Sequence, residues 1–299
     1  MNVLVMPNVD KKHAVECVCA VACRLRDLGA QAALDSRYQQ SIPPDVPVRY
    51  GDFEDLLRGC DCVVAIGGDG TILHSAKHAA VLAKPVLGIN LGRLGFMAGL
   101  EYNELDLLGR LLTREATADR RMMLEIIHRT QTKTTCYLAL NDAVVSKGSL
   151  SRIIDLDVLC CGKMVGSYRA DGIIVSTPTG STAYALSAGG PMIEPSLDSI
   201  AMTPICPHSL VARTVIFSGD KTLQIRPRFD GPEDDREIFI TIDGEQAIPL
   251  GPNDELTIQK SQVSATLLNL NGREFYEIIN QKFLGRSYAI SQNQEVDRS

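Results

Sequence analysis

Apolar and polar residues are arranged along the first 120 residues in a pattern that predicts strands and helices in turn. Short runs of aliphatic, often β-branched residues predict buried strands, and apolar residues spaced three or four apart predict helices. Such a βαβ rhythm is typical of a parallel sheet that binds ligands at the carboxyl ends of its strands. The predicted strands are Val3–Met6, Val63–Ile66 and Pro85–Asn90, and the predicted helices are Lys12–Leu28, Asp52–Arg58, Thr71–Leu82 and Asn103–Thr113, with a glycine-rich loop over Leu91–Leu100.

The pattern changes after Arg120, where short strand-like runs follow one another with turn residues between them. Repeated short strands of this kind predict a β-rich, β-sandwich-like domain. The predicted strands are Met122–Thr130, Thr134–Leu140, Ala143–Ser146, Ile153–Cys160, Gly172–Ser176, Thr214–Phe217, Thr222–Ile225, Glu237–Ile242, Glu255–Lys260 and Ser264–Leu270. Arg226–Glu237, which is rich in charged residues, is predicted to be a solvated loop.

Together these patterns predict an α/β N-terminal domain with a parallel sheet, followed by a β-rich C-terminal domain. We expect the first domain to span residues 1–120 and the second to span residues 121–274. Phe275–Leu284 has helical spacing, and we expect residues 275–290 to pack back on the first domain. The polar residues 291–299 are expected to form a disordered tail.

Composition narrows the class of protein. The chain has 299 residues, of which 45% are hydrophobic and 22% charged, and these are ordinary globular values. A net charge of -6 argues against nonspecific nucleic-acid binding, which needs a basic surface. No run approaches the roughly 18 apolar residues of a membrane span, and Met1–Pro7 has the pattern of a first strand rather than of a signal peptide. We therefore expect a cytoplasmic protein that binds neither membranes nor nucleic acids.

The nine cysteines do not have metal-binding or disulfide spacing. The chain contains no C-x-x-C pair and no cysteine–histidine cluster at zinc spacing. We expect reduced thiols that are mostly buried as small hydrophobic side chains.

A glycine-rich turn, Gly67–Thr71, directly follows the predicted strand Val63–Ile66 and precedes a predicted helix. Glycines allow the backbone to approach a phosphate closely, and a helix N-terminus offers free N–H groups to it. Asp69 is unusual in such a turn, because a carboxylate repels phosphate unless a metal ion or a reacting hydroxyl lies between them. Asp69 is therefore a candidate proton acceptor or metal partner, and the alternative is an N-cap of the following helix.

A second motif, Ser176–Pro191, follows the apolar run Ile173–Val175. Its first nine residues include five serine or threonine side chains. A strand that ends in such a segment must turn sharply, and it can present hydroxyl and backbone N–H groups to an anion or a ribose. The alternative is a hydroxyl-rich turn with no ligand.

In order and spacing, these two motifs together with Asn141-Asp142 and Asp171-Gly172 resemble the NAD kinases. Pro204–His208 and Asp243–Gln246 add to the resemblance, which covers most of the chain from Gly67 to about Gln246. The glycine turn alone is a weak signal, because lipid kinases and phosphofructokinases have similar turns. The Ser176–Pro191 motif is far more specific, and one departure is Arg213-Thr214, where many relatives have Arg-Pro.

The resemblance implies roles for individual residues. Asp69 matches the catalytic acid, which contacts the ribose 2′-hydroxyl. The implied nucleotide-binding positions are Asp69, Gly70, His74, Phe96, Asn141, Asp142, Arg152, Arg169, Asp171, Thr182, Ala183, Tyr184, Ala185, Leu186, Ser187 and Gln246. Several have plain structural alternatives: His74 and Phe96 suit a surface or core role, and Asn141-Asp142 suits a turn between strands. Many relatives have Glu where this chain has Asp142.

The resemblance also implies an activity. An NAD kinase transfers the γ-phosphoryl group of ATP, or of another donor, to the 2′-hydroxyl of the adenosine ribose of NAD, with Mg²⁺ or another divalent metal. The implied partners are NAD, ATP and the metal ion, and the implied assembly is a homo-oligomer, either a dimer or a tetramer. Two alternatives are a lipid kinase of the same superfamily and a noncatalytic NAD(P)(H) sensor.

Overall fold

The computed structural model describes residues 1–149, 152–231 and 236–284. The chain divides into two compact units. Unit 1 comprises Met1–Arg120 together with the C-terminal residues from Ala265 onward, and unit 2 comprises Arg121–Ser264. The polar segment 291–299 that the sequence predicts to be disordered lies outside the described residues.

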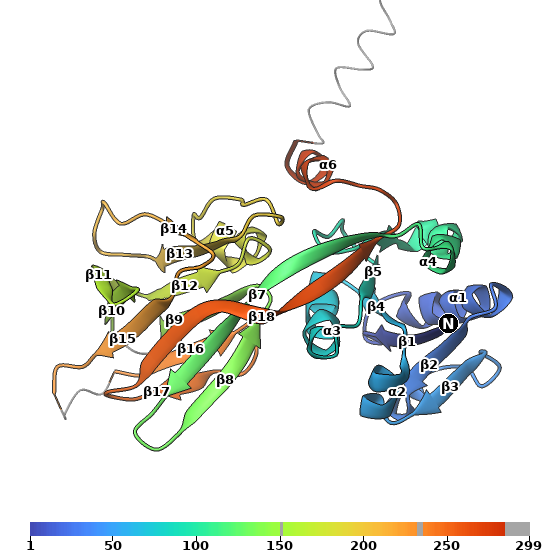
Figure 1. Cartoon of the computed structure of the whole chain (residues 1–299), viewed down its shortest axis with the longest axis horizontal. Coiled ribbons are helices and arrows are strands. Elements are labelled where there is room, and N and C mark those ends of the chain that lie inside the picture. The colour runs from blue at the N-terminus through green and yellow to red at the C-terminus, as the bar shows by residue number, and fades with distance from the viewer. Residues whose placement is uncertain (150–151, 232–235, 285–299) are drawn as a thin grey trace, which may run out of the picture. The chain divides into compact units, whose positions relative to one another are not determined.

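Unit 1 is built on a parallel sheet, as the βαβ rhythm predicts (Figure 1). The strand order is β18-β5-β4-β1-β2-β3, and each neighbouring pair is parallel. Its strands are β1 (Asn2–Pro7), β2 (Gln31–Asp35), β3 (Val48–Gly51), β4 (Cys62–Gly67), β5 (Val86–Asn90), the short β6 (Leu100–Glu101) beside β5, and the last residues of β18 (Glu255–Asn269). All of β4 is buried, which explains its unbroken apolar sequence.

Helices cover this sheet and complete its core. They are α1 (Ala14–Asp27), α2 (Phe53–Gly59), α3 (Asp69–Val81), α4 (Gly109–Thr113) and α6 (Phe275–Ile279), with shorter helical turns η1 (Ser36–Tyr38), η2 (Tyr102–Leu108) and η4 (Asn280–Leu284). The apolar stripe of α1, including Val18 and Leu25, packs on strand residues such as Val64 and Ile89. Asp52 caps α2 by accepting from the backbone N–H groups of Glu54 and Asp55.

The predicted elements of unit 1 are confirmed, with ends that differ by no more than two residues except in one case. The expected helix Asn103–Thr113 is a 3₁₀ turn, η2, that continues as α4. Strands β2 and β3 are not among the predicted elements, because their sequences contain alanine, glycine and charged residues rather than an apolar run.

Unit 2 contains two antiparallel sheets that share one core. One sheet has the order β14-β13-β12-β9-β16-β17, and the other contains β11-β10-β15-β18 with β7 and β8. The strands are β7 (Thr117–Arg129), β8 (Thr134–Ala139), β9 (Asp142–Lys147), β10 (Ile154–Cys160), β11 (Lys163–Ala170), β12 (Gly172–Ser176), β13 (Ser199–Ile205), β14 (Val215–Ser218), β15 (Leu223–Arg228), β16 (Ile238–Ile242) and β17 (Ile248–Leu250). Ile173 and Val175 of one sheet and Leu156 and Val158 of the other belong to the same buried cluster, so the predicted sandwich-like packing is confirmed.

Three strand predictions in unit 2 are corrected. Glu255–Lys260 and Ser264–Leu270 form one continuous strand, β18, because the polar residues between them keep the extended conformation. β15 extends to Arg228, into the segment expected to be a loop. β11, β13 and β17 are not among the predicted strands, because charged residues and glycine interrupt the apolar pattern of the first and a proline lies in each of the other two.

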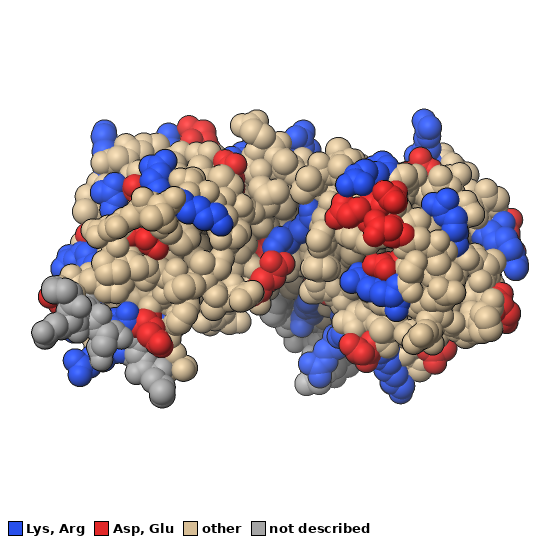
Figure 2. All heavy atoms as spheres, turned by 90° about the horizontal axis from the view of Figure 1, so that it is seen from below, with Lys and Arg blue, Asp and Glu red and all other residues tan. Residues whose placement is uncertain are grey.

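The surface carries charged side chains of both signs. On the face shown in Figure 2, Lys and Arg side chains are interspersed with Asp and Glu side chains over both units. Among the described residues, no helix has the length and apolar character needed to cross a membrane.

Candidate active site

The glycine-rich turn lies where the sequence places it, between β4 and α3. β4 ends at Gly67 and α3 begins at Asp69, with Gly68 as its N-cap residue. A Cβ on Gly67 would overlap the Thr71 side chain, whereas a Cβ on Gly70 would meet no atom within 4 Å. Gly67 is thus required for packing, and Gly70 leaves the first turn of α3 open to a ligand.

Asp69 does not cap α3, so the alternative interpretation of this residue is wrong. Its carboxylate instead accepts hydrogen bonds from the backbone N–H groups of Phe96 (3.0 Å) and Met97 (3.2 Å). Gly95 lies against the same carboxylate so closely that a Cβ there would overlap it. The half-buried Asp69 is therefore held by the loop that follows β5, and two backbone donors fix its orientation.

That loop is itself anchored from the end of β5. The amide nitrogen of the buried Asn90 donates to the carbonyl oxygens of Gly92 (3.2 Å) and Arg93 (3.0 Å) and to a carboxylate oxygen of Glu101 (2.9 Å). Burial raises the pKa of Glu101, while the bond from Asn90 opposes that rise. Asn90 therefore fixes the loop that in turn holds Asp69.

Two further unit 1 residues surround Phe96. Its half-buried ring lies 6.2 Å from the ring of Phe275, and the Lys282 Nζ lies 3.9 Å from its centroid. Neither partner is among the residues predicted from the sequence, because both lie far from Phe96 in the chain. The nucleotide contact that the resemblance implies for Phe96 stays a prediction.

His74 is exposed on α3, one turn beyond the glycine-rich segment. Its ring meets His78 edge-on, with centroids 4.6 Å apart, and His78 meets Phe53 in the same manner at 5.4 Å. Its predicted nucleotide contact is not tested by these neighbours.

In unit 2, the hydroxyl groups of the Ser176–Thr182 turn mostly bond within the protein. Thr177 donates to the Leu140 carbonyl oxygen (2.6 Å), Ser181 to that of Pro178 (2.6 Å) and Thr182 to that of Thr179 (3.1 Å). Thr179 accepts from Arg121 (3.3 Å). Four of the five hydroxyls therefore have partners within the protein and help to build the turn, and their contact with a ligand stays a prediction.

This turn packs directly on Asn141. The Thr177 N–H donates to the Asn141 carbonyl oxygen (2.9 Å), and a Cβ on Gly180 would overlap the Asn141 backbone. In the β9–β12 pair, Ser176 is opposite Asp142. The two motifs that carried the resemblance in this region are thus brought together, one beside the other.

Asp243, at the end of β16, holds the Asn141–Asp142 turn. Its carboxylate accepts from the backbone N–H groups of Leu140 (3.0 Å), Asn141 (2.8 Å) and Asp142 (3.0 Å). Asp243 and Gly244 have φ values of 53° and 71°, and the Glu245 N–H closes the turn on Ile242. These are the conformations that an Asp-Gly pair adopts readily, so the Asp-Gly signal could have revealed this supporting role.

Burial raises the pKa of the Asp142 carboxyl group. Asp142 is 4% exposed, and burial first and the charge of Asp243 second raise its pKa to about 7. The Asn141 Oδ1 and the Ser176 Oγ beside it are buried and have no hydrogen-bond partner among the described residues. Unsatisfied polar atoms of this kind mark a place where a ligand or water completes the bonding.

The residues of the second motif that follow the Ser176–Thr182 turn form a short helix. Thr182 ends the short turn η3 (Gly180–Thr182), and Tyr184–Ser187 form α5. Tyr184 is 47% exposed, so its ring is available to a planar ligand. Ala185 is buried, and Gln246 is exposed in the turn after Asp243.

Three predicted residues lie at the other end of β12. Asp171 precedes this strand and forms an ion pair with Lys147 at 3.0 Å, whereas Thr177 follows it. Arg169 and Arg152 are exposed near Asp171, because the β10–β11 register pairs Ile154 with Ala170. α5 packs back over β12, because Ala185 contacts the cluster that includes Ile174 and Ile205, and Ile205 accepts from the Asp171 N–H. The shared ligand contact of these three residues and Tyr184 stays a prediction.

The described residues contain no group of three or more His, Cys, Asp and Glu side chains that could hold a metal ion. All nine cysteines lie in the described ranges and are free thiols, but only Cys17, Cys60 and Cys62 are buried, so the expected burial is wrong for most of them.

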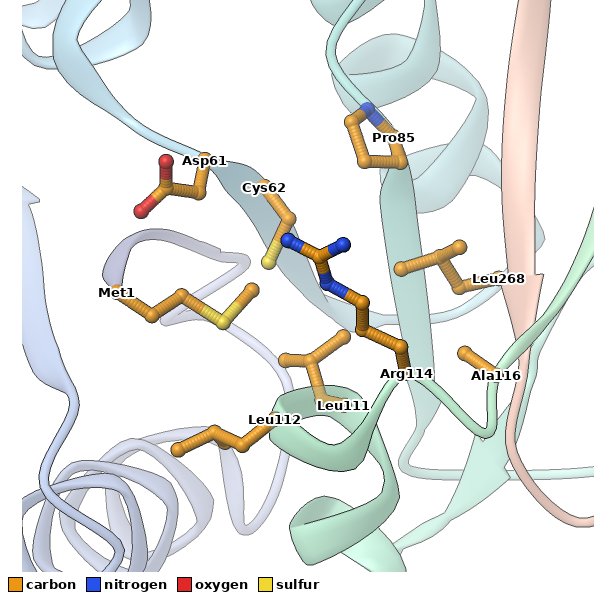
Figure 3. Close-up of a pocket in the computed structure, with 9 residues that line it drawn as sticks. All are labelled: Met1, Asp61, Cys62, Pro85, Leu111, Leu112, Arg114, Ala116 and Leu268. Atoms are coloured by element: carbon orange, nitrogen blue, oxygen red, sulfur yellow. The ribbon is translucent and has the colours of Figure 1, made fainter.

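A pocket of about 500 Å³ lies at the opposite edge of the unit 1 sheet (Figure 3). Met1, Cys62 and Pro85 mark the amino ends of β1, β4 and β5, and Arg114 projects among them. None of its lining residues is among the predicted site positions, and those of unit 1 follow the carboxyl ends of β4 and β5.

Comparisons with known proteins cover both units. Residues 6–116 match the family described as the ATP-NAD kinase N-terminal domain, and residues 140–270 match the ATP-NAD kinase C-terminal domain. The chain is 41% identical to an NAD kinase of Symbiobacterium thermophilum over 281 residues, which cover 93% of this chain and 97% of that protein. It is 33% identical to an NAD kinase of Acetivibrio thermocellus over 298 residues, which cover 97% and 99%.

Two solved structures are similar. The yeast NADH kinase complexed with NADH has a TM-score of 0.84 at 24% identity, covering 96% of this chain and 88% of that one, and supports the fold alone. An NAD kinase from Archaeoglobus fulgidus in complex with ATP has a TM-score of 0.72 at 25% identity, covering 94% and 98%.

Proposed function

The chain belongs to the ATP-NAD kinase family, and we propose that it transfers the γ-phosphoryl group of ATP to the 2′-hydroxyl of the adenosine ribose of NAD, forming NADP. In this reaction the ribose oxygen forms a bond to the γ-phosphorus, the bond from that phosphorus to the oxygen of ADP breaks, and the hydroxyl loses its proton. The enzyme must therefore hold the hydroxyl in line, accept the proton and balance the phosphate charge.

The orientation of Asp69 is the observation that carries this proposal. An N-cap aspartate would use its carboxylate on α3, but this one is fixed by Phe96 and Met97 beside the open face of Gly70. A carboxylate is a weak base, so its main contributions are to orient the 2′-hydroxyl and to accept its proton late in the transfer. The first turn of α3 then offers N–H groups to the donor phosphates.

Unit 2 supplies the dinucleotide-binding side chains in this proposal. The unsatisfied Asn141 Oδ1 and the exposed Tyr184 ring are the features that support it. An amide oxygen can accept from a base or a ribose, and an aromatic ring can stack on a base. We assign Asp142, Thr182–Ser187, Gln246, Arg152, Arg169 and Asp171 to the same role, on the family resemblance.

A divalent cation fits the residues present. Mg²⁺ is usually held by one or two carboxylates together with substrate phosphates, so a cluster of three protein ligands is not required. Asp69 is the residue that would contact it in unit 1. When bound, the cation neutralises phosphate charge.

A direct assay tests the activity. The purified chain is incubated with NAD⁺ or NADH, with ATP, another triphosphate or polyphosphate, and with Mg²⁺ or Mn²⁺, and NADP(H) is measured with an NADP-specific dehydrogenase. We expect NADP(H) with at least one donor and none after chelation of the metal. A folded protein that forms no NADP(H) with any donor overturns the proposal: NAD binding without turnover would indicate a sensor, and phosphorylation of diacylglycerol would indicate a lipid kinase.

We also propose that the protein is a homo-oligomer in the cytoplasm. Leu210 and Val211 are 89% and 86% exposed, and neighbouring apolar side chains this exposed favour association. Nine free thiols suit a reducing compartment. Light scattering of the wild type and of Leu210→Ser tests whether the protein is a homo-oligomer. Cell fractionation tests whether it lies in the cytoplasm.

A further inference from the structure

The C-terminal residues of the described chain return to the loop that holds Asp69. The Phe275 ring lies 6.2 Å from that of Phe96, and the Lys282 Nζ lies 3.9 Å from the Phe96 centroid. The backbone N–H of Phe96 is one of the two donors to the Asp69 carboxylate. Phe96 therefore contacts both groups: its backbone N–H bonds the Asp69 carboxylate, and its ring lies beside the Lys282 ammonium.

The charges of Lys282 and Asp69 also interact. Burial lowers the pKa of the Lys282 ammonium, and the negative charge of Asp69 opposes that change. A second ammonium group lies at the same turn, because a Cβ built on Gly68 would be 3.7 Å from the Lys11 Nζ. Two cations, one from near each end of the chain, thus lie about the Gly68–Asp69 turn.

A phosphoryl group transferred at this turn needs such cations. The group carries negative charge on three oxygens, and it must come close to a carboxylate that repels it. A lysine ammonium is a compact point charge with three donors and is a common phosphate ligand in proteins. The Lys282 Nζ itself lies over the Phe96 ring, and the ammonium N–H groups that do not face the ring can bond a phosphate oxygen.

We propose that Lys282 binds the phosphoryl group that the donor transfers, opposite the carboxylate of Asp69. This inference rests on the proposed kinase activity and adds a residue for which neither the motifs nor the family resemblance gives a role. It also gives the segment Phe275–Leu284 a function. The segment places the Lys282 ammonium beside the Gly68–Asp69 turn, which lies far from it in the sequence.

The test compares Lys282→Met and Lys282→Arg with Lys12→Met, an exposed lysine of the same unit. Methionine keeps an apolar stem that packs on Phe96 but has no charge, whereas arginine keeps a charge that binds phosphate. Initial rates are measured with ATP and NAD varied separately. Calorimetric titration of ATP with Mg²⁺, and of NAD⁺, then measures binding without turnover.

We expect Lys282→Met to lower kcat/KM for ATP by about 10–100-fold and ATP affinity by about 10-fold, with NAD affinity within about 2-fold. Lys282→Arg should recover most of this loss, and Lys12→Met should behave as wild type. Unchanged ATP binding and turnover in Lys282→Met overturns the inference. Equal losses in the Met and Arg variants, with a matching fall in Tm, would overturn it too, because they would show a packing role. If the wild type forms no NADP, the proposed function fails, and the ATP titration still decides the role of Lys282.

Discussion

In each unit one aspartate carboxylate accepts several backbone N–H groups from a loop, but the proposed roles of the two aspartates differ. In unit 1 the carboxylate of Asp69 collects two backbone N–H groups from the loop after β5, and in unit 2 the carboxylate of Asp243 collects three from Leu140–Asp142. In the first case we propose that the acid is the reactive group, and the loop supports it. In the second case the acid is the support, and the loop carries side chains that we propose bind the dinucleotide. An acid in a motif therefore does not reveal by itself which of the two it is.

The glycines opposite these acids differ in the same way. Gly95 lies against the side chain of Asp69, whereas Gly180 lies against the backbone of Asn141. A carboxylate at the end of a side chain can rotate away from an added methyl group, but a backbone inside a buried turn cannot. The first glycine thus protects the position of one reactive group, and the second protects the fold of the turn.

The largest effect is expected from Asp69→Asn. The variant keeps the shape of the side chain, but it loses the base, and its amide must face one of the two N–H donors. We expect kcat to fall by about 10²–10⁴-fold, with NAD affinity within a few-fold in calorimetry. Asp106→Asn, an exposed acid of the same unit, is the control. A near-normal kcat in Asp69→Asn would mean that the acid supports the loop and is not the reactive group.

Asp142→Asn tests, through the pH dependence of stability, whether burial and Asp243 raise the pKa of Asp142. Because the folded state raises the pKa of Asp142 to about 7, the folded protein binds more protons than the unfolded chain between about pH 4 and 7. Wild-type stability should therefore decrease as pH rises through this range, by as much as about 4 kcal/mol. Urea unfolding from pH 5 to 8 should show this slope reduced in Asp142→Asn and unchanged in Asp106→Asn. An identical slope in Asp142→Asn contradicts the assignment.

Gly180→Ala and Gly95→Ala distinguish a glycine that packs on backbone atoms from one that packs on a side chain. We expect Gly180→Ala to lower the free energy of unfolding by about 3 kcal/mol, because backbone atoms must move. Gly95→Ala should keep a Tm near that of wild type and lose at least about 10-fold in kcat, since it displaces the Asp69 carboxylate. Gly59→Ala, where a Cβ meets nothing within 4 Å, is the control for both. Equal Tm losses in the two variants would remove the distinction.

Tyr184→Ala should change the binding of NAD⁺ rather than the rate of transfer. A lost stacking contact is worth about 1–3 kcal/mol, so KM for NAD⁺ should rise by about 5–150-fold with little change in kcat. Leu197→Ala, another exposed apolar side chain of unit 2, is the matched control. A decrease confined to kcat would assign Tyr184 to the transfer step rather than to binding.

Much of the fold could be predicted from the sequence, because periodicity reports directly on burial. β4 and α1 were predictable since each buries a regular set of apolar residues. β13 was not, because its Pro204 suggests an edge or a loop, while its pairing with two neighbours depends on the rest of the sheet.

The site was predictable only where one segment carries the chemistry. Asp69 and Asn141 stand out in short motifs, but Lys282 becomes a neighbour of Phe96 only after the chain has folded back. The roles of the hydroxyls after β12 are ambiguous in the sequence for a related reason. A serine or threonine that bonds a carbonyl in its own turn has the same sequence signature as one that bonds a ligand.

The course of β18 has a consequence for synthesis on the ribosome. Leu267 and Leu268 of β18 pair with Val86 and Leu87 of β5, and the Leu270 carbonyl oxygen accepts from Arg110. Residues 1–120 leave the ribosome first, yet this side of their sheet stays open until almost the whole chain has been translated. Unit 2 ends at Ser264, so all of its strand residues are translated before Leu267. A premature stop codon between Ser264 and Leu267 would therefore spare the strands of unit 2 and harm the part of the protein that was made first.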